Sequence, residues 1–168
     1  MTFALSLFAL AFVPMLFEAR RSAASARALR LAGAVEPAGD VYATMQIAYP
    51  VCFAAMIFEG WLRNHGFTTG VIPGAVVFTA AKALKYWAIL TLGPRWTFRV
   101  LVPPHSIRSV RGPYRFLRHP NYVGVAGELA GFALLAGALY TGAISLVAFG
   151  ALLLKRIRVE ERALGFRV

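Results

Sequence analysis

The chain has 168 residues, of which 59% are hydrophobic and 15% are charged, and its formal net charge is +11. The apolar residues form long blocks, which is typical of a membrane protein. Basic chains often bind nucleic acid, but these arginines lie between apolar blocks and form no single basic face, which argues against that function. The single cysteine, Cys52, excludes an intrachain disulfide.

Five apolar segments approach the roughly 20 residues that a helix needs to cross a bilayer. They are residues 2–17, 41–62, 71–92, 122–140 and 141–154. The first segment is expected to remain as a span and not to be a cleaved signal peptide, because its arginines follow the apolar run. Residues 20–34, rich in Ala, Arg and Ser, are expected to form a loop. The last two segments predict a tight helical hairpin that turns at residues 140–142.

The predicted fold is therefore an all-α integral membrane protein of one domain with about five transmembrane helices. Three N-terminal spans occupy residues 1–92, a loop residues 93–121, the hairpin residues 122–154 and a final helix residues 155–168. Cytoplasmic segments of membrane proteins carry an excess of Lys and Arg. With the N-terminus outside, fifteen of the eighteen basic residues are cytoplasmic. The loop and the C-terminal helix are then both cytoplasmic.

Several charged residues fall inside these spans. Lys82 and Lys85 lie within the third, where a bare charge costs at least about 2.5–3.5 kcal/mol. Either their long stems carry the charges to the interface, or Lys85 faces a polar cavity. Glu59 lies near the end of its span and is expected at the interface. Glu128 is expected either to face a cavity or to pair with an arginine.

The glycines of the fourth span have a regular spacing. Gly124, Gly127 and Gly131 are three and four residues apart, so they share one helix face. This pattern predicts close packing against a neighbouring helix.

A polar segment, RGPYRFLRHPNYVG, spans residues 111–124. Pro113 and Pro120 restrict its backbone, and Pro120 also disfavours helix at His119, which predicts a shaped loop. His119, Asn121 and Tyr122 are expected to point into one space at the start of the fourth span. The segment contains neither GxxxxGK[ST] nor GxGxxG, the usual phosphate-binding loops. No metal site is expected, because the three histidines lack the spacing of zinc ligands.

The C-terminal segment LLLKRIRVEERALG places Arg156 and Glu160 four residues apart on one helix face, with Glu161 beside them. Ordinary surface pairing, worth about 0.2–0.5 kcal/mol, is one explanation. The alternative is that the two carboxylates bind a ligand with an ammonium group or a ribose diol.

GPYRFLRHPNYVG, followed after about forty residues by RIRVEERALG, resembles the C-terminal signature of the isoprenylcysteine carboxyl methyltransferase family, which also resembles the membrane phospholipid methyltransferases. LKYWAILTLGPRWT is family-like as well, so the resemblance covers residues 84–165. It implies an integral membrane enzyme that binds S-adenosylmethionine on the cytoplasmic side. The pocket would be closed by the loop and the C-terminal helix.

The resemblance also implies roles for individual residues. The residues implied to bind the cofactor are Tyr114, His119, Pro120, Asn121, Tyr122 and Glu160. Arg156 would face the nucleophile of the substrate, as a catalytic and substrate-binding residue. A further cofactor-contacting segment would correspond to residues 106–109.

The implied reaction is S-adenosylmethionine-dependent methylation of a carboxylate or hydroxyl oxygen on a lipophilic acceptor, such as an isoprenylcysteine or an alkylpyrone-like lipid of short bacterial relatives. The amine of a phospholipid is a further acceptor to consider. A carboxylate needs only a cation such as Arg156 to position it. A hydroxyl must also lose its proton, and His119 can serve as the base only if it is not holding the cofactor.

Two other functions stay open. Sterol and steroid reductases also resemble the RHPNYxG stretch and use NADPH, although the paired glutamates favour the methyl donor. The third possibility is a non-enzymatic membrane adaptor, which has no need of a His, Tyr and Glu cluster at one membrane face.

Overall fold

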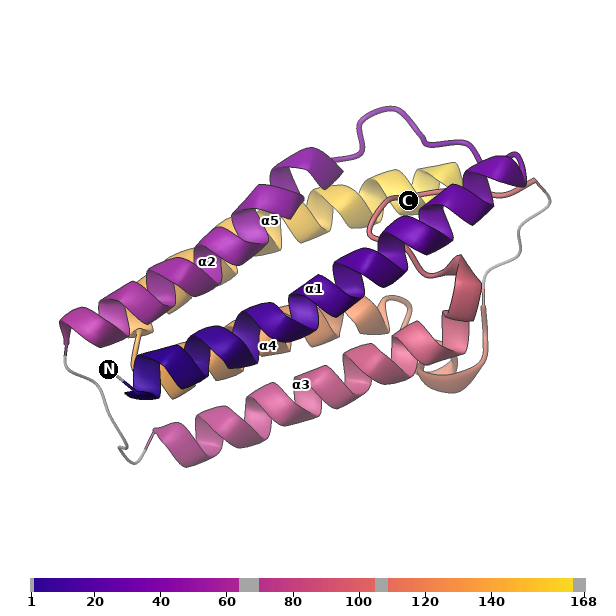
Figure 1. Cartoon of the computed structure of the whole chain (residues 1–168). Helices are drawn as coiled ribbons and strands as arrows, with labels where there is room; N and C mark the ends of the chain where they lie inside the picture. The colour runs from indigo at the N-terminus through magenta and orange to yellow at the C-terminus, as the bar shows by residue number, and fades with distance from the viewer. Residues whose placement is uncertain (1, 64–69, 105–108, 165–168) are drawn as a thin grey trace.

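The computed structural model describes residues 2–63, 70–104 and 109–164 and contains five long helices (Figure 1). They are α1 (Thr2–Leu31), α2 (Tyr42–Leu62), α3 (Val71–Leu92), α4 (Pro120–Ala136) and α5 (Leu139–Ala163). Two 3₁₀ turns, η1 (Gly93–Arg95) and η2 (Gly112–Arg115), lie between α3 and α4. Apart from one isolated bridge, the described residues form no β-structure. The predicted all-α fold is confirmed.

Three helices are long and apolar enough to cross a membrane, namely Thr2–Leu31, Tyr42–Leu62 and Val71–Arg95. Large apolar side chains such as Leu16 and Phe17 are exposed on α1, as expected for a surface in contact with lipid. The chain is thus an all-α membrane protein. Because α4 has only 17 residues and α5 continues into a charged end, the number of five spans stays a prediction.

The prediction of a loop at residues 20–34 was wrong, because α1 continues as helix to Leu31. Ala, Leu and Arg, which dominate this stretch, are strong helix formers. With 30 residues the helix is about 45 Å long, which exceeds the hydrocarbon core of about 30 Å. The C-terminal part of α1 therefore extends beyond the apolar layer. There its Ser22 hydroxyl accepts a hydrogen bond from the amide of Phe98 (2.7 Å).

The hairpin exists, but its turn lies at Gly137 and Ala138 and not at residues 140–142. Gly137 adopts a left-handed conformation (φ 63°), which glycine tolerates best and which commonly ends a helix. The Ala138 amide then donates to the carbonyl of Ala133 (2.9 Å). Gly142 instead lies inside α5, against the side chain of Ala133.

Helices α3 and α4 pack closely along the glycine face predicted from the sequence. A Cβ atom added at Gly124 would lie 2.9 Å from the Cβ of Lys85, and one at Gly131 would lie 2.7 Å from the Cα of Phe78. At Gly127 the corresponding distance to the Cβ of Ala81 is 2.8 Å. Contacts this short leave no room for a larger side chain, so the predicted close packing is confirmed.

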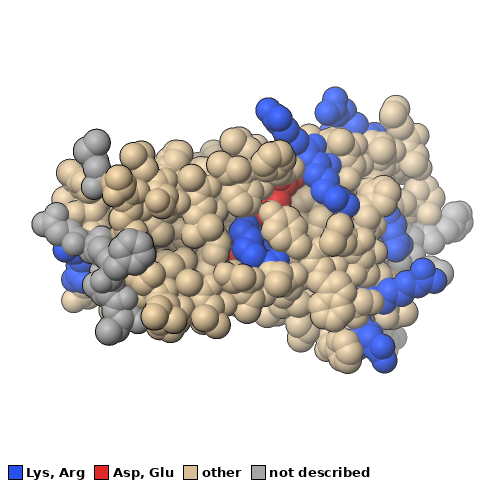
Figure 2. All heavy atoms as spheres, turned by 60° about the horizontal axis from the view of Figure 1, so that its bottom comes forward, with Lys and Arg blue, Asp and Glu red and all other residues tan. Residues whose placement is uncertain are grey.

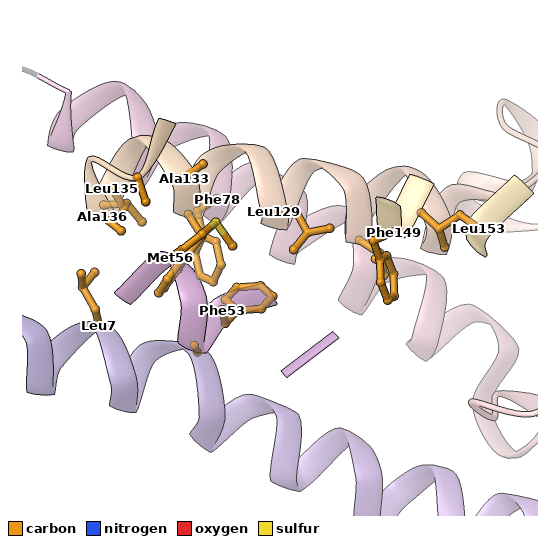
Figure 3. Packing of buried hydrophobic residues seen from close by; sticks show 14 residues of the cluster. Leu7, Phe53, Met56, Phe78, Leu129, Ala133, Leu135, Ala136, Phe149 and Leu153 are labelled. Carbon is orange, nitrogen blue, oxygen red and sulfur yellow. The ribbon is translucent and has the colours of Figure 1, made fainter. Parts of the chain in front are cut away.

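The apolar core follows α4 and takes side chains from every other helix (Figure 3). The ring of Phe132 lies 4.7 Å from that of Phe53 on α2 and 5.9 Å from that of Phe78 on α3. Aromatic pairs at these separations add to the burial of apolar surface. The core therefore fixes α4 as the central helix, and with it the positions of Tyr122 near its start and Glu128 in its middle.

Candidate functional site

A cavity of about 860 Å³ is lined by residues of α1, α2, the α3–α4 connection, the start of α4 and the second half of α5. The end of α5 and the α3–α4 connection come together at the same end of the bundle as the α1–α2 loop (Figure 1). Small-molecule sites typically measure about 300–1,000 Å³. Six of the residues singled out in the sequence line this cavity: Tyr114, His119, Asn121, Tyr122, Arg156 and Glu160. Pro120 is buried at the first position of α4 and sets where that helix begins.

Tyr122, Arg156 and Glu160 form a hydrogen-bonded group that we call the polar triad. The Tyr122 hydroxyl donates to Glu160 Oε2 (2.6 Å) and accepts from Arg156 Nε (2.9 Å). Arg156 is buried, so the pattern of Arg156 and Glu160 is not an ordinary surface pair. The start of α4 and the end of α5 thus meet through one phenol.

His119 joins the same wall of the cavity. Its Nε2 lies 3.1 Å from Glu161 Oε1, and its ring stacks on that of Tyr122 with centroids 5.5 Å apart. The backbone of His119 is not helical, as expected for a residue before proline. The HPNY segment and the paired glutamates, 38 or more residues apart in the sequence, are therefore neighbours in the structure.

Asp40 is a site residue that sequence reasoning missed. Arg156 Nη1 donates to Asp40 Oδ1 (3.0 Å), and Arg156 Nη2 donates to the carbonyl of Phe98. Asp40 also accepts from the amides of Val100 (3.1 Å) and Tyr42 (3.2 Å). With the bond to Tyr122, three of the five N–H donors of Arg156 are engaged. The only signal in the sequence was that Asp40 is one of just seven acidic residues.

The loop after η1 forms another wall and is held by contacts from distant segments. Val35 and Val102 exchange two backbone hydrogen bonds of 3.0 Å, which ties this loop to the α1–α2 loop. The indole of Trp96 is buried and donates to Asn121 Oδ1 (3.3 Å). Sequence reasoning gave Trp96 no role, because no local pattern indicates a contact 25 residues away.

Charge is distributed unevenly around the cavity. Most basic side chains visible in Figure 2 lie towards its right, the end of the bundle that carries the α1–α2 loop and the α3–α4 connection. Arg27 and Arg95 are exposed and line the cavity. Burial alone would raise the pKa of Glu36, but hydrogen bonds and charge from Arg99 and Arg30 outweigh it and lower that pKa below its usual value. The mouth is therefore basic, and Glu36, which pairs with two of the arginines that line the cavity, is held ionised.

Tyr114 of η2 is half-buried beside the polar triad. Burial raises the pKa of this phenol far above its usual value, and the nearby charge of Glu160 raises it further. Tyr114 is therefore neutral at physiological pH and can donate a hydrogen bond from the cavity wall.

Deeper in the bundle, Lys82 and Lys85 do not extend to the interface. Lys85 Nζ lies 2.6 Å from Glu18 Oε2 and 3.3 Å from Glu128 Oε2. Lys82 Nζ lies 3.1 Å from Glu18 Oε1 and 3.3 Å from Glu128 Oε1, and the Tyr49 hydroxyl donates to Glu128. We call these five residues the buried ion cluster. Lys85 lines the cavity, which agrees with the second of the two alternatives given for it from the sequence. Glu128 pairs with the two lysines and not with an arginine.

Glu59 lies at the other end of the bundle, away from this cavity. It is buried and accepts from the amide (2.8 Å) and the hydroxyl (2.7 Å) of Thr141 in the first turn of α5. A carboxylate there satisfies helix N–H groups and interacts favourably with the helix dipole. These contacts with the start of α5 explain why a carboxylate is buried at Glu59.

Of the segment expected at residues 106–109, only Ser109 lies within the described residues, and His65 and His105 lie outside them.

Comparison with known proteins gives one family and two relatives. The profile of the isoprenylcysteine carboxyl methyltransferase (ICMT) family matches residues 74–165, more than half of the chain. Uncharacterized protein YpbQ of Bacillus subtilis is 31% identical over 132 residues, which cover 79% of each chain. An uncharacterized protein of Haemophilus influenzae is 30% identical over 142 residues, covering 83% of this chain and 81% of the relative. No solved structure matches the chain.

Proposed function

The chain belongs to the isoprenylcysteine carboxyl methyltransferase family, and on that premise we propose that it transfers a methyl group from S-adenosylmethionine to a lipophilic acceptor. Family membership supports a membrane methyltransferase-like role. The observation that carries the finer proposal is the polar triad on the wall of the 860 Å³ cavity. All three of its residues lie within the stretch that matches the family.

We assign the methyl donor to the wall formed by Tyr114, His119, Asn121, Tyr122 and Glu160, with Pro120 setting the start of α4. Glu160 suits a ribose diol or an ammonium group, because a carboxylate accepts several hydrogen bonds. Glu160, held by the Tyr122 hydroxyl, brings a carboxylate to the cavity wall. This negative charge attracts a cationic group such as a sulfonium.

The acceptor is proposed to enter from the bilayer and to be methylated on a carboxylate or hydroxyl oxygen, as in an isoprenylcysteine or alkylpyrone-like lipid. Apolar side chains of Met45, Phe149 and Leu153 line the cavity beside the polar triad and suit a lipophilic molecule. Arg156 is the residue that we assign to catalysis and to acceptor binding. Its two remaining N–H donors are available to the oxygens of a carboxylate acceptor.

The activated methyl group of the sulfonium supplies the chemistry, so the protein has mainly to align the reactants and exclude water. We place the reaction at the cytoplasmic face of a bacterial inner membrane, with the N-terminus outside and the C-terminus cytoplasmic. Residues 1–92 then form three spans, residues 122–154 the spanning hairpin, and residues 93–121 and 155–168 the cytoplasmic cofactor site. The distribution of basic residues supports this orientation.

Isothermal titration calorimetry of the protein in lipid nanodiscs tests the proposal. We expect S-adenosylmethionine to bind and NADPH not to bind. Tyr122→Phe removes the hydroxyl that holds the Glu160 carboxylate in the proposed donor site, so the methyl donor would lose a charged hydrogen-bond partner worth about 1.5–3 kcal/mol. It should therefore weaken S-adenosylmethionine binding by about tenfold or more, whereas Tyr140→Phe, at an exposed ring on the opposite end, should leave it unchanged.

Binding of NADPH without binding of S-adenosylmethionine would replace this proposal with a reductase. Glu160→Gln and His119→Ala extend the test along the same wall. If both variants bind S-adenosylmethionine as tightly as the wild type, a non-enzymatic membrane adaptor becomes the better explanation of the chain.

A further inference from the structure

The buried ion cluster joins four helices within the bundle. Glu18 comes from α1, Tyr49 from α2, Lys82 and Lys85 from α3, and Glu128 from α4. Its two carboxylates balance its two ammonium groups, so the cluster carries no net charge. Charged residues inside membrane-spanning helices are expensive and usually mark a functional site, which makes a purely structural role an incomplete explanation.

The cluster belongs to the wall of the same cavity as the polar triad. Glu18, Tyr49 and Lys85 line this cavity. Tyr122 and Glu128 are six residues apart on α4, about 9 Å along the helix axis. Val125 and Leu153 line the cavity as well and are apolar. The cavity therefore has two polar layers, and space between them in which a donor and an acceptor can meet.

Methylation of a hydroxyl group requires a group that accepts its proton. Among the described residues, Glu18 and Glu160 are the carboxylates that line the cavity. Glu160 already accepts from Tyr122, and His119 lies against Glu161. Glu18 contacts the lysines of the buried ion cluster and no residue of the polar triad, so it is the cavity carboxylate that lies outside the proposed donor site.

The geometry of Glu18 and Lys85 suits a hydroxyl group. Each oxygen of Glu18 lies near one lysine, and the Tyr86 phenol also hydrogen-bonds to this carboxylate. Because a carboxylate offers about four acceptor positions, one is left for a ligand. Two of the three N–H donors of Lys85 are directed at Glu18 and Glu128, which leaves one for a ligand. The pair offers both an acceptor for the hydroxyl proton and a donor to the hydroxyl oxygen.

We propose that Glu18 and Lys85 form the acceptor site for a lipophilic molecule with an ionisable hydroxyl, and that Glu18 accepts its proton. This assignment rests on the proposed methyl transfer. The O–H bond breaks and its proton passes to the Glu18 carboxylate, while Lys85 stabilises the developing oxyanion. A lone pair of the oxygen forms the bond to the methyl carbon, and the electron pair of the broken S–C bond stays on sulfur as a neutral thioether. The proton leaves Glu18 for solvent after transfer.

The test compares Glu18→Gln with Glu59→Gln, a second buried carboxylate that lies outside the cavity. Both variants are reconstituted in nanodiscs with two probes, a long-chain alkylpyrone with a free hydroxyl and a farnesylated N-acetylcysteine with a free carboxylate. General bases contribute about 10²–10⁴-fold, so Glu18→Gln should lower kcat for the hydroxyl probe by about 100-fold or more. It should leave the dissociation constant of S-adenosylmethionine within about threefold of the wild-type value. Glu59→Gln should leave both unchanged.

The carboxylate probe separates proton transfer from a structural role. A carboxylate has no proton to lose, so any transfer to it should be insensitive to Glu18→Gln. Equal losses with both probes would indicate displacement of α1 and would overturn the assignment, as would wild-type activity of Glu18→Gln. Lys85→Met should weaken binding of the hydroxyl probe by about tenfold, measured directly by calorimetry.

Failure of the underlying function gives a different result. If the wild-type protein does not bind S-adenosylmethionine, the proposed methyltransferase is refuted. If it binds S-adenosylmethionine and transfers no methyl group to the hydroxyl probe, the assignment of Glu18 and Lys85 is refuted while the methyl-donor site stands.

Discussion

Replacement of Asp40 tests whether this unforeseen carboxylate holds Arg156, the proposed catalytic residue, in place. The side chain of Asp40 is buried and accepts three hydrogen bonds, one from the guanidinium of Arg156 (3.0 Å) and two from backbone amides. Asp40→Asn keeps an acceptor oxygen but removes the charge. A hydrogen bond to a charged group is worth about 1.5–3 kcal/mol, and we expect a destabilisation of that size.

Asp40→Ala should cost more, about 3–5 kcal/mol, because it leaves the buried guanidinium of Arg156 without its counter-charge. The control is Glu36→Gln, which removes a second arginine-paired carboxylate of the same loop, in more exposed surroundings. Glu36 pairs with partly exposed arginines, and such pairs contribute at most about 1 kcal/mol. Reversible unfolding in mixed detergent micelles, followed by circular dichroism, measures all three changes in the free energy of unfolding.

The order Asp40→Ala, then Asp40→Asn, then Glu36→Gln is the expected result, from most to least destabilised. If Asp40→Ala is no more destabilised than Glu36→Gln, Asp40 does not stabilise Arg156, and the network around this guanidinium has to be reconsidered. A destabilised Asp40→Asn that keeps full affinity for S-adenosylmethionine would limit the role of Asp40 to folding.

Two further predictions concern packing and pH. Gly131→Ala should destabilise the fold by about 1–3 kcal/mol, because its methyl group would overlap the backbone of α3. Gly150→Ala, at a helix position with open space, should be neutral or stabilising by up to about 1 kcal/mol. Equal unfolding free energies for the two variants would contradict the close packing of α3 and α4. The folded-state pKa of Glu36 is lowered below its unfolded value, so its stabilising contribution is present above the ordinary glutamate pKa and is lost as pH falls through the folded-state pKa. The difference in unfolding free energy between the wild type and Glu36→Gln should therefore be present at about pH 7 and disappear at about pH 3, and a difference that grew on acidification would have the wrong sign.

Most of the helices could be predicted from hydropathy alone. The segments expected at residues 41–62 and 71–92 agree with α2 and α3 within one residue. The errors arose where apolarity is a poor guide. Residues 20–31 are polar enough to look like a loop, but their helix propensity continues α1, and the hairpin turn followed the left-handed Gly137 and not the later Gly142.

Parts of the site were also predictable, because the HPNY segment and the paired glutamates are local patterns. Their meeting depends on the antiparallel hairpin, which brings the start of α4 against the end of α5. The partners of these residues were not predictable. Asp40 and Trp96 have no distinctive neighbours in the sequence, and only the loop contacts bring them to Arg156 and Asn121.

The sequence by itself determined the membrane class, the helical fold, the glycine face of α4 and the family, because each of these depends on composition or on short-range spacing. The tertiary structure decided which charges meet. Glu18, Lys85 and Glu128 come from three helices, and nothing within any one helix indicates its partner. Burial in an apolar bundle makes an unpaired charge too costly, so helix packing selected the pairs and placed Glu18 and Lys85 on the wall of the cavity.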